Sequence, residues 1–236
     1  MTETTRAMQV AGDPQRTLQA ESGEFLLQEY HLRQDGRSWT ILHTGAILSR
    51  ADESHFLGEL TDRLPYGVAL WPAAIALAHE MVARAEVIKG KRVLELGAGT
   101  GLAGIVAASL GGRVVQTDRN ELALSVCRRN GERNGTATIE YRLADWTDWA
   151  DTERYDWIIG SDILYGEVMH PALRQIFASN LAPGGRVLIA DPFRAVSFKL
   201  LEELEAAGWS VAVSTWRIGE ALGSRPIGLF ELAPPR

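Results

Sequence analysis

The feature that most constrains this chain is a short apolar run that ends in a loop of alternating glycines. Residues 93–102 read Val-Leu-Glu-Leu-Gly-Ala-Gly-Thr-Gly-Leu, and a helical pattern follows them. This order predicts a buried strand, a tight turn and the start of a helix. Glycines suit such a turn because the backbone can take unusual dihedral angles and a ligand can approach without meeting a Cβ atom. We therefore expect a ligand site at the end of this strand.

Two acidic residues discriminate between the ligands that a glycine loop can hold. Gly99–Gly104 matches the G-x-G-x-x-G pattern of dinucleotide-binding proteins, and Asp118 has about the spacing of their ribose-binding acid. Glu95 would face the pyrophosphate of a dinucleotide, which Coulomb repulsion disfavours unless water or a cation intervenes. S-adenosylmethionine has no phosphate and carries a sulfonium and an ammonium group. The acids therefore favour S-adenosylmethionine, with Asp118 accepting hydrogen bonds from its ribose; a nicotinamide cofactor, or a turn without a ligand, is the alternative.

The length, charge and cysteine content of the chain exclude several classes of protein. The 236 residues, 46% of them hydrophobic, allow one α/β domain with an N-terminal addition. A net charge of −6 argues against a general nucleic-acid binder. The one cysteine, Cys127, excludes an intrachain disulfide, and the histidines show no metal-ligand spacing, so no metal is expected. Because no signal core or membrane-length apolar run is present, we expect a cytoplasmic protein without a membrane partner.

The chain divides into three parts. Residues 1–23 are polar and predict a flexible tail. Residues 24–68 predict a β-hairpin, with Asp35-Gly36 in its turn, followed by a lid or short helix over 51–63. Residues 69–236 carry the ligand loop and predict the cofactor-binding domain.

That domain alternates strands and helices. Strands are expected at Arg92–Leu96, Arg113–Thr117, Thr138–Leu143, Tyr155–Gly160, Arg186–Ala190, Ser210–Ile218 and Pro226–Leu232. Helices are expected from Leu70 to about Ala85 and at Leu102–Leu110, Glu121–Asn134, Pro171–Leu181 and Ser197–Ala207. The alternation predicts an α/β, Rossmann-like fold with a mostly parallel sheet, and the final pair of strands predicts an antiparallel edge. A nicotinamide-binding sheet has two similar halves, whereas this pattern resembles the seven-stranded methyltransferase fold.

Further candidate site residues follow other strands or open a helix. Asp145 could accept from an adenine amino group and Trp146 could border the ring, although a helix cap and a packed Trp would explain both. Trp71 could cover the cofactor by a cation–π contact, or could simply anchor a helix. Asp162 and Tyr165 close the fourth strand, where a methyl acceptor should lie. Asp162 would hold an incoming ammonium and Tyr165 would orient the neutral amine for in-line attack.

These segments together resemble the methyltransferase-like, seven-β-strand protein lysine methyltransferases, known as lysine methyltransferase family 16. The resemblance covers about residues 60–195 and includes Leu70–Ala74, Val93–Leu102, Thr117-Asp118, Asp145-Trp146 and Ser161–Tyr165. It implies that Glu95, Gly97, Gly99, Asp118 and Asp145 serve the cofactor, and that Asp162 and Tyr165 serve the acceptor. The implied activity is methylation of a lysine in a protein. A small-molecule methyltransferase, a nicotinamide-dependent oxidoreductase and a cofactor-binding module without turnover stay open, as does the oligomeric state.

Overall fold

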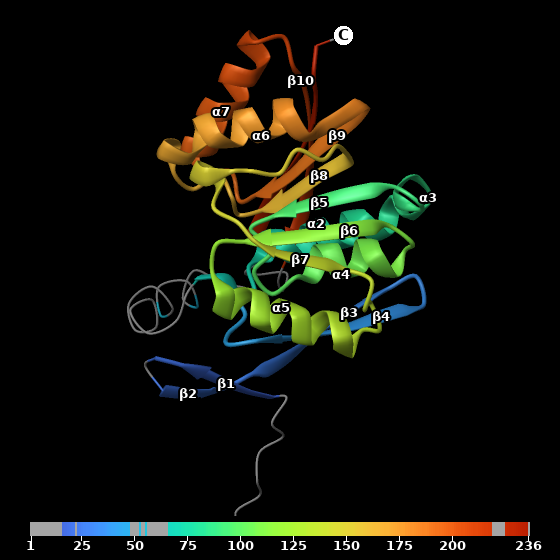
Figure 1. Cartoon of the computed structure of the whole chain (residues 1–236), viewed down its shortest axis with the longest axis vertical. Coiled ribbons are helices and arrows are strands. Elements are labelled where there is room, and N and C mark those ends of the chain that lie inside the picture. The colour runs from blue at the N-terminus through green and yellow to red at the C-terminus, as the bar shows by residue number, and fades with distance from the viewer. Residues whose placement is uncertain are drawn as a thin grey trace, which may run out of the picture.

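A twisted seven-stranded sheet forms the centre of the computed structural model, which describes residues 16–21, 23–47, 52, 55, 66–218 and 225–235 (Figure 1). Its strands are β5 (Arg92–Leu96), β6 (Arg113–Asp118), β7 (Glu140–Leu143), β8 (Tyr155–Ser161), β9 (Leu181–Asp191), β10 (Ser210–Ile218) and β11 (Arg225–Ala233). Each lies within a few residues of its predicted position, except that β9 begins five residues earlier than expected.

The strand order is β10-β11-β9-β8-β5-β6-β7. Strands β9, β8, β5, β6 and β7 run parallel, and β11 is antiparallel to both of its neighbours, β9 and β10. The predicted mostly parallel sheet with an antiparallel last strand is therefore confirmed. In this order the chain reverses direction across the sheet after β7, so β5 and β8 are neighbours. Open α/β sheets bind ligands at such a switch point, beyond the carboxyl ends of the strands.

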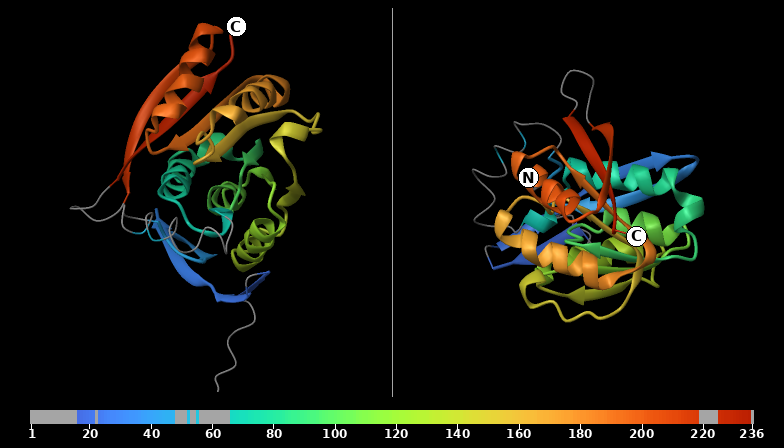
Figure 2. Two further views of the ribbon diagram at one scale, coloured as in Figure 1. Left: turned by 90° about the vertical axis from the view of Figure 1, so that its left-hand side faces the viewer. Right: turned by 90° about the horizontal axis from the view of Figure 1, so that it is seen from above.

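Helices cover both faces of the sheet (Figure 2). One face carries α2 (Pro72–Ala83), α4 (Leu102–Ser109) and α5 (Glu121–Arg133), and the other carries α6 (His170–Asn180) and α7 (Ala195–Ala206); a short helix, α3 (Ala85–Ile88), follows α2. Pro72 occupies the first turn of α2, where its missing N–H costs no hydrogen bond. Within the described residues, no helix combines the length and the apolar character that a membrane crossing requires.

The central strand β5 shows why this sequence forms a covered parallel sheet. Val93 is buried in the core shared with α2 and α4, whereas Leu94 and Leu96 are buried in the core shared with α6 and α7. A strand with apolar side chains on both faces has no face to present to water, so helices must pack on both. Full burial of each side chain contributes about 1.5–3 kcal/mol.

The predicted N-terminal hairpin is present and has the predicted turn. Strands β3 (Gln28–Gln34) and β4 (Arg37–His43) pair antiparallel, and Asp35 and Gly36 take φ values of 50° and 73°. Two central residues with positive φ are typical of the hairpin turn that matches strand twist.

A second hairpin corrects the predicted tail. Strands β1 (Thr17–Ala20) and β2 (Gly23–Leu26) pair antiparallel, and Leu18 is buried in a small core with Leu42 and Val68. Residues 17–20 are therefore part of the fold. Most of the predicted lid over 51–63 lies outside the described residues.

Two asparagines fasten the hairpin β3–β4 to helix α5. Buried Asn130 accepts from the N–H of Leu42 at 2.7 Å and donates to the carbonyls of Leu42 and Thr100 at 3.0 and 2.9 Å. One turn later, Asn134 accepts from the N–H of Thr40 at 2.9 Å and donates to its carbonyl at 2.8 Å. Their side-chain amides thus replace a neighbouring strand along the edge of β4.

The early start of β9 brings the glycine pair Gly184-Gly185 inside the strand. Helix α6 ends at Asn180, one residue before its predicted end, and the register of β9 with β8 shifts between Tyr155 and Trp157. β9 carries extra residues at this shift, which are typical of a bulge.

Candidate functional site

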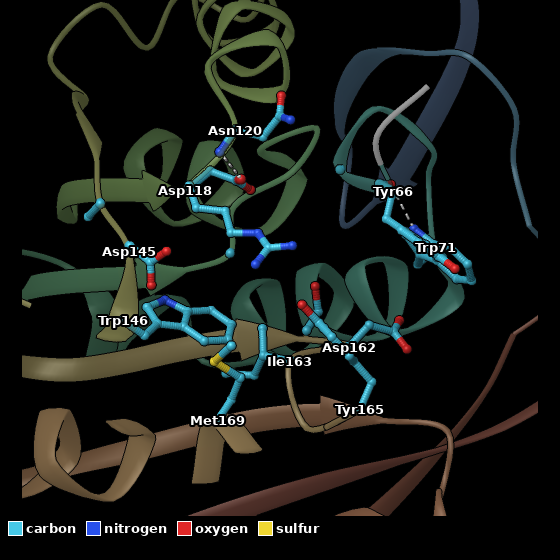
Figure 3. A pocket seen from close by; sticks show the side chains of 15 residues that line it. Tyr66, Trp71, Asp118, Asn120, Asp145, Trp146, Asp162, Ile163, Tyr165 and Met169 are labelled. Atoms are coloured by element: carbon cyan, nitrogen blue, oxygen red, sulfur yellow. Dashed lines mark hydrogen bonds between the residues drawn. The ribbon is translucent and has the colours of Figure 1, made fainter. Parts of the chain in front are cut away.

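A pocket opens at the carboxyl ends of β5, β6, β7 and β8 (Figure 3). The side chains and backbone that line it are Tyr66, Gly67, Trp71, Gly97, Asp118, Arg119, Asn120, Ala144, Asp145, Trp146, Ser161, Asp162, Ile163, Tyr165 and Met169. The site residues predicted from the sequence that are among them are Trp71, Gly97, Asp118, Asp145, Trp146, Asp162 and Tyr165. Segments far apart in the chain are therefore brought to one cavity, as the strand-end argument expects.

Glu95, whose carboxylate was expected to stand beside the ligand, is not among the residues that line this pocket. The side chain is only 2% exposed, and its Oε2 accepts from the N–H of Gly104 at 3.0 Å and from Nε2 of Gln116 at 2.5 Å. Burial raises the pKa of Glu95 to about 7. A Cβ at Gly104 would collide with this carboxylate, so glycine lets the strand and helix α4 come together there. Glu95 therefore fixes the first turn of helix α4, directly after the glycine loop, through a hydrogen bond to its backbone.

Asp118 joins the glycine loop to the pocket. Its Oδ2 accepts from the N–H of Gly99 at 3.0 Å, and its Oδ1 accepts from the N–H of Asn120 at 2.9 Å. Burial raises the pKa of this carboxyl, while the two backbone donors oppose the shift. Gly99 is not among the residues that line the pocket, and its backbone N–H donates to Asp118, which does line it. The carboxylate is thereby held at the pocket wall in one orientation.

Gly97 leaves open the space between Ile163 and Trp146 at the base of the pocket. Its φ of 64° lies in the left-handed region, and a Cβ there would stand 3.1 Å from Ile163 and 3.3 Å from Trp146. A side chain would strain the backbone and fill the space between those two residues. The bare backbone of Gly97 is thus available to a ligand that lies on the Trp146 side.

Asp145 and Trp146 follow β7 and form one end of the pocket (Figure 3). Asp145 Oδ1 accepts from the N–H and the hydroxyl of Thr147 at 2.8 and 2.7 Å, which caps the short 3₁₀ turn that starts at Trp146. These hydrogen bonds lower the pKa of the exposed Asp145 carboxyl. The cap that was considered as an alternative is therefore real, and it leaves the second oxygen, Oδ2, for a ligand. Trp146 and Met169 both pack against the core on the α6 side.

Asp162 and Tyr165 form the other end of the pocket (Figure 3). Asp162 follows β8 with a φ of 55°, and its side chain is 11% exposed. Neither carboxylate oxygen has a well-aligned hydrogen bond among the described residues, although Nη2 of Arg194 lies 2.6 Å from Oδ1. Burial raises the pKa of Asp162 to about 6 against the opposing effect of Arg194. Tyr165 is 58% exposed and lies at the mouth.

Trp71 lies on the rim of the pocket. Its indole N–H donates to the carbonyl of Tyr66 at 3.0 Å, and the two rings stack with centroids 5.8 Å apart. The residue also precedes Pro72 at the start of α2. Trp71 therefore contacts Tyr66 next to the start of α2 and also lines the pocket, and its cation–π contact with the cofactor stays a prediction.

Sequence reasoning missed several lining residues. Arg119 and Asn120 directly follow Asp118, so extending the strand-end argument by two residues would have found them. Tyr66, Gly67 and Met169 come from turns without a periodic pattern, and no local signal marks them.

A family model described as lysine methyltransferase matches residues 57–201. Protein N-lysine methyltransferase METTL21A of Danio rerio is 39% identical over 134 residues, which cover 54% of this chain and 61% of that protein. EEF1A lysine methyltransferase 3 of Xenopus tropicalis is 33% identical over 156 residues, covering 61% and 69%. Histone-arginine methyltransferase METTL23 of Mus musculus is 34% identical over 152 residues, covering 62% and 56%. The chain thus spans less than two thirds of the length of several relatives that it matches.

Solved structures support the fold. N-methyltransferase NodS of Bradyrhizobium japonicum, in complex with S-adenosyl-L-homocysteine, superposes with a TM-score of 0.56 at 17% identity, covering 69% of this chain and 88% of NodS. A ribosomal protein L11 methylase of Lactobacillus delbrueckii superposes with a TM-score of 0.54 at 24% identity, covering 68% and 77%.

Proposed function

The chain belongs to the lysine methyltransferase family, and from this premise we propose that it transfers the methyl group of S-adenosylmethionine to a lysine side chain of a protein. The proposal gives the two ends of the pocket different tasks. The end formed by Asp118, Asp145 and Trp146 holds the cofactor, and the end formed by Asp162 and Tyr165 holds the acceptor.

The residues at the cofactor end suit S-adenosylmethionine. The fixed carboxylate of Asp118 can accept hydrogen bonds from two neighbouring ribose hydroxyls. Oδ2 of Asp145 can accept from an adenine amino group, and the Trp146 indole offers a flat apolar surface for the ring. The space above Gly97, which a Cβ would fill, allows the ligand to contact the loop backbone. When bound, the cofactor supplies an electrophilic methyl group on a sulfonium.

Helix α4 argues against a dinucleotide in the same place. A pyrophosphate at such a loop depends on the N–H groups of the first turn of the following helix. Here the N–H of Gly104, in the first turn of α4, is already bound by the buried carboxylate of Glu95. Because Glu95 already accepts from the N–H of Gly104, this donor is not free for the pyrophosphate of a dinucleotide.

The observation that carries the acceptor assignment is the state of Asp162. A buried carboxylate normally has hydrogen-bond donors for its oxygens, because an unpartnered polar group costs about 1–3 kcal/mol. Among the described residues, Oδ2 of Asp162 has no hydrogen-bond donor and Oδ1 contacts only the guanidinium of Arg194, and the side chain lines the pocket. A lysine ammonium, with three N–H donors, can supply the hydrogen bond that Oδ2 of Asp162 lacks.

Asp162 and Tyr165 then bind and orient the amine. The proton of the ammonium must leave before attack, and it passes to solvent. With the cofactor bound, the lone pair of the neutral amine would form the new C–N bond as the S–CH₃ bond breaks in line with it, and S-adenosylhomocysteine would be the leaving group. Asp162 holds an N–H of the amine and the Tyr165 hydroxyl aligns it, so these residues reduce the freedom of the acceptor before the reaction.

Two measurements test this function. Calorimetric titration with S-adenosylhomocysteine should show binding, whereas NAD and NADP should show none. Incubation of the protein and labelled S-adenosylmethionine with a protein extract, followed by acid hydrolysis, should yield labelled methyl-lysine. Label found only in methyl-arginine, which the histone-arginine relatives make relevant, would overturn the lysine assignment. Label found only in small molecules would overturn the protein substrate.

We also propose that the protein acts in the cytoplasm. The support is its cysteine content, because the single cysteine of the chain, Cys127, is buried and cannot form an intrachain disulfide.

A further inference from the structure

Arg194 lies behind Asp162 and outside the residues that line the pocket. It follows β9, and its Nη2 is 2.6 Å from Oδ1 of Asp162. Its other terminal nitrogen, Nη1, is 2.9 Å from Oδ2 of Asp191, a side chain with no exposed surface. One guanidinium therefore bridges two carboxylates on neighbouring strands. A planar guanidinium can make such a two-sided contact, whereas the ammonium of a lysine cannot hold the same geometry.

Contacts within the loop after β9 hold Arg194 next to Asp162 and Asp191. Oδ1 of Asp191 accepts from the backbone N–H of Arg194 at 2.9 Å, so Asp191 holds both the main chain and the side chain of this residue. Phe193 takes a φ of 59°, and its ring packs against Gly228, where a Cβ would stand 2.8 Å from it. A backbone hydrogen bond, from Asp162 N–H to the Ala190 carbonyl at 2.9 Å, joins the loop after β8 to strand β9.

Backbone strain is concentrated at the same contact. The described residues other than glycine with positive φ are Asp35, Asp162 and Phe193. Asp35 is explained by the hairpin turn, and the other two lie on the loops that bring Arg194 and Asp162 together. Strained conformations persist only where the surroundings determine them, and they are often found at functional sites.

We propose that Arg194 is a positioning residue for the acceptor site, which holds the carboxylate of Asp162 ionised and aimed into the pocket. This inference rests on the proposed role of Asp162. The guanidinium of Arg194 contacts Oδ1 of Asp162 and is not among the residues that line the pocket, so it supplies charge while leaving Oδ2 able to accept from an amine. Without this charge, a carboxyl buried to this extent would bind a proton and lose its attraction for an ammonium.

The charged groups that face Asp162 can be named. Arg194 and Asp191 approach from the loop after β9, and Arg225 acts from the start of β11. Of these, Arg194 makes the ion pair and has the largest opposing effect to burial on the pKa of Asp162. Removing Arg194 should raise that pKa further above about 6, so more of the protein would carry a protonated Asp162 at neutral pH.

The first experiment is the pH profile of label transfer into the protein extract, for the wild type, Arg194→Met and Arg194→Lys. In Arg194→Met the acidic limb should move up by at least one pH unit, while the dissociation constant for S-adenosylhomocysteine stays within about threefold of the wild type. Arg194→Lys should restore the position of the limb because it restores the charge. Its maximal rate should stay at least fivefold below the wild type because the bridge to Asp191 is lost.

The matched control is Arg174→Met, which removes an exposed guanidinium that pairs with Glu203 at 2.8 Å. It should leave the profile unchanged. An unmoved acidic limb in Arg194→Met, or a loss of S-adenosylhomocysteine affinity as large as the loss of rate, would overturn the proposal.

A second experiment does not depend on activity. In protein labelled with ¹³C at the aspartate carboxyl carbons, the Asp162 resonance is identified by its loss in Asp162→Asn. Its titration midpoint should be higher in Arg194→Met than in the wild type, and an equal midpoint would refute the inference. If the wild type transfers no methyl group, the proposed function fails while this titration still decides the role of Arg194. Thermal unfolding of each variant identifies any that has lost its fold. If Arg194→Met is unfolded, the maximal rate of Arg194→Lys is compared with that of the wild type instead.

Discussion

The carboxylate of Asp118 accepts a hydrogen bond from the backbone N–H of Gly99 at 3.0 Å, so the end of β6 holds the loop that follows β5. The same carboxylate lines the pocket. Loop geometry and ligand binding therefore depend on one side chain, and a change there should affect both.

Asp118→Ala should weaken binding of S-adenosylhomocysteine by about 1–3 kcal/mol, because charge-assisted hydrogen bonds to the ribose are lost. Calorimetry measures the effect. Asp156→Ala is a suitable control, since Asp156 accepts from the N–H of Arg92 at the opposite end of the sheet and should leave the affinity unchanged. Unaltered affinity in Asp118→Ala would contradict the ribose assignment.

Asp162→Asn should separate binding from transfer. Asparagine tolerates the left-handed backbone that Asp162 adopts, so the fold and the affinity for S-adenosylhomocysteine should be retained. The rate of label transfer should fall by about 100-fold, since the group that holds the amine in position is lost. A parallel fall of affinity and rate would show that Asp162 serves the cofactor as well.

Glu95 should make stability depend on pH in a defined direction. Its pKa in the folded protein is raised to about 7 from 4.5, so the folded state binds more protons than the unfolded state between these values. The free energy of unfolding contributed by this group should therefore fall as pH rises through that window, by about 3 kcal/mol in total. Urea unfolding of the wild type and Glu95→Gln at pH 5 and pH 8 checks this. The same pH dependence in both proteins would rule out the effect.

Asn130→Ala should destabilise the fold by about 3 kcal/mol, because it leaves the buried N–H and carbonyl of Leu42 without partners. Asn134→Ala removes similar contacts with Thr40, but at a half-buried position where water can replace them. It should therefore cost clearly less in urea unfolding. Equal losses would mean that burial of the amide is not what matters.

Much of the fold was predictable because its signals are local. The apolar run of β5, the glycines after it and the helical period of α4 lie within eighteen residues. The cluster of Asp118, Asp145 and Asp162 was predictable for a different reason, since the ends of parallel strands meet at one edge of a sheet.

The direction in which the Glu95 side chain points can be predicted from the sequence. Side chains alternate along a strand, so Glu95 lies on the same face as Val93, which packs with α2 and α4, and on the opposite face from Leu94 and Leu96. That alternation directs the carboxylate under the loop, where Gly104 meets it.

Other parts of the site depend on contacts that no local pattern encodes. Met169 reaches the pocket from a turn after β8, and Arg194 reaches Asp162 only because β8 and β9 are neighbours. The assignment of residues 17–20 to a tail failed because their one buried side chain, Leu18, packs against distant residues of β4 and α5.

The fastening of β4 by Asn130 limits how this protein can be shortened in the laboratory. Recombinant fragments trimmed to the matched family segment, which starts at residue 57, would discard both hairpins. Without the hairpins, α5 would lose its contacts with β4, and the side-chain amide of Asn130 would keep only its hydrogen bond to the Thr100 carbonyl. Aggregation of such fragments would thus say nothing about catalysis, and expression should begin no later than β1.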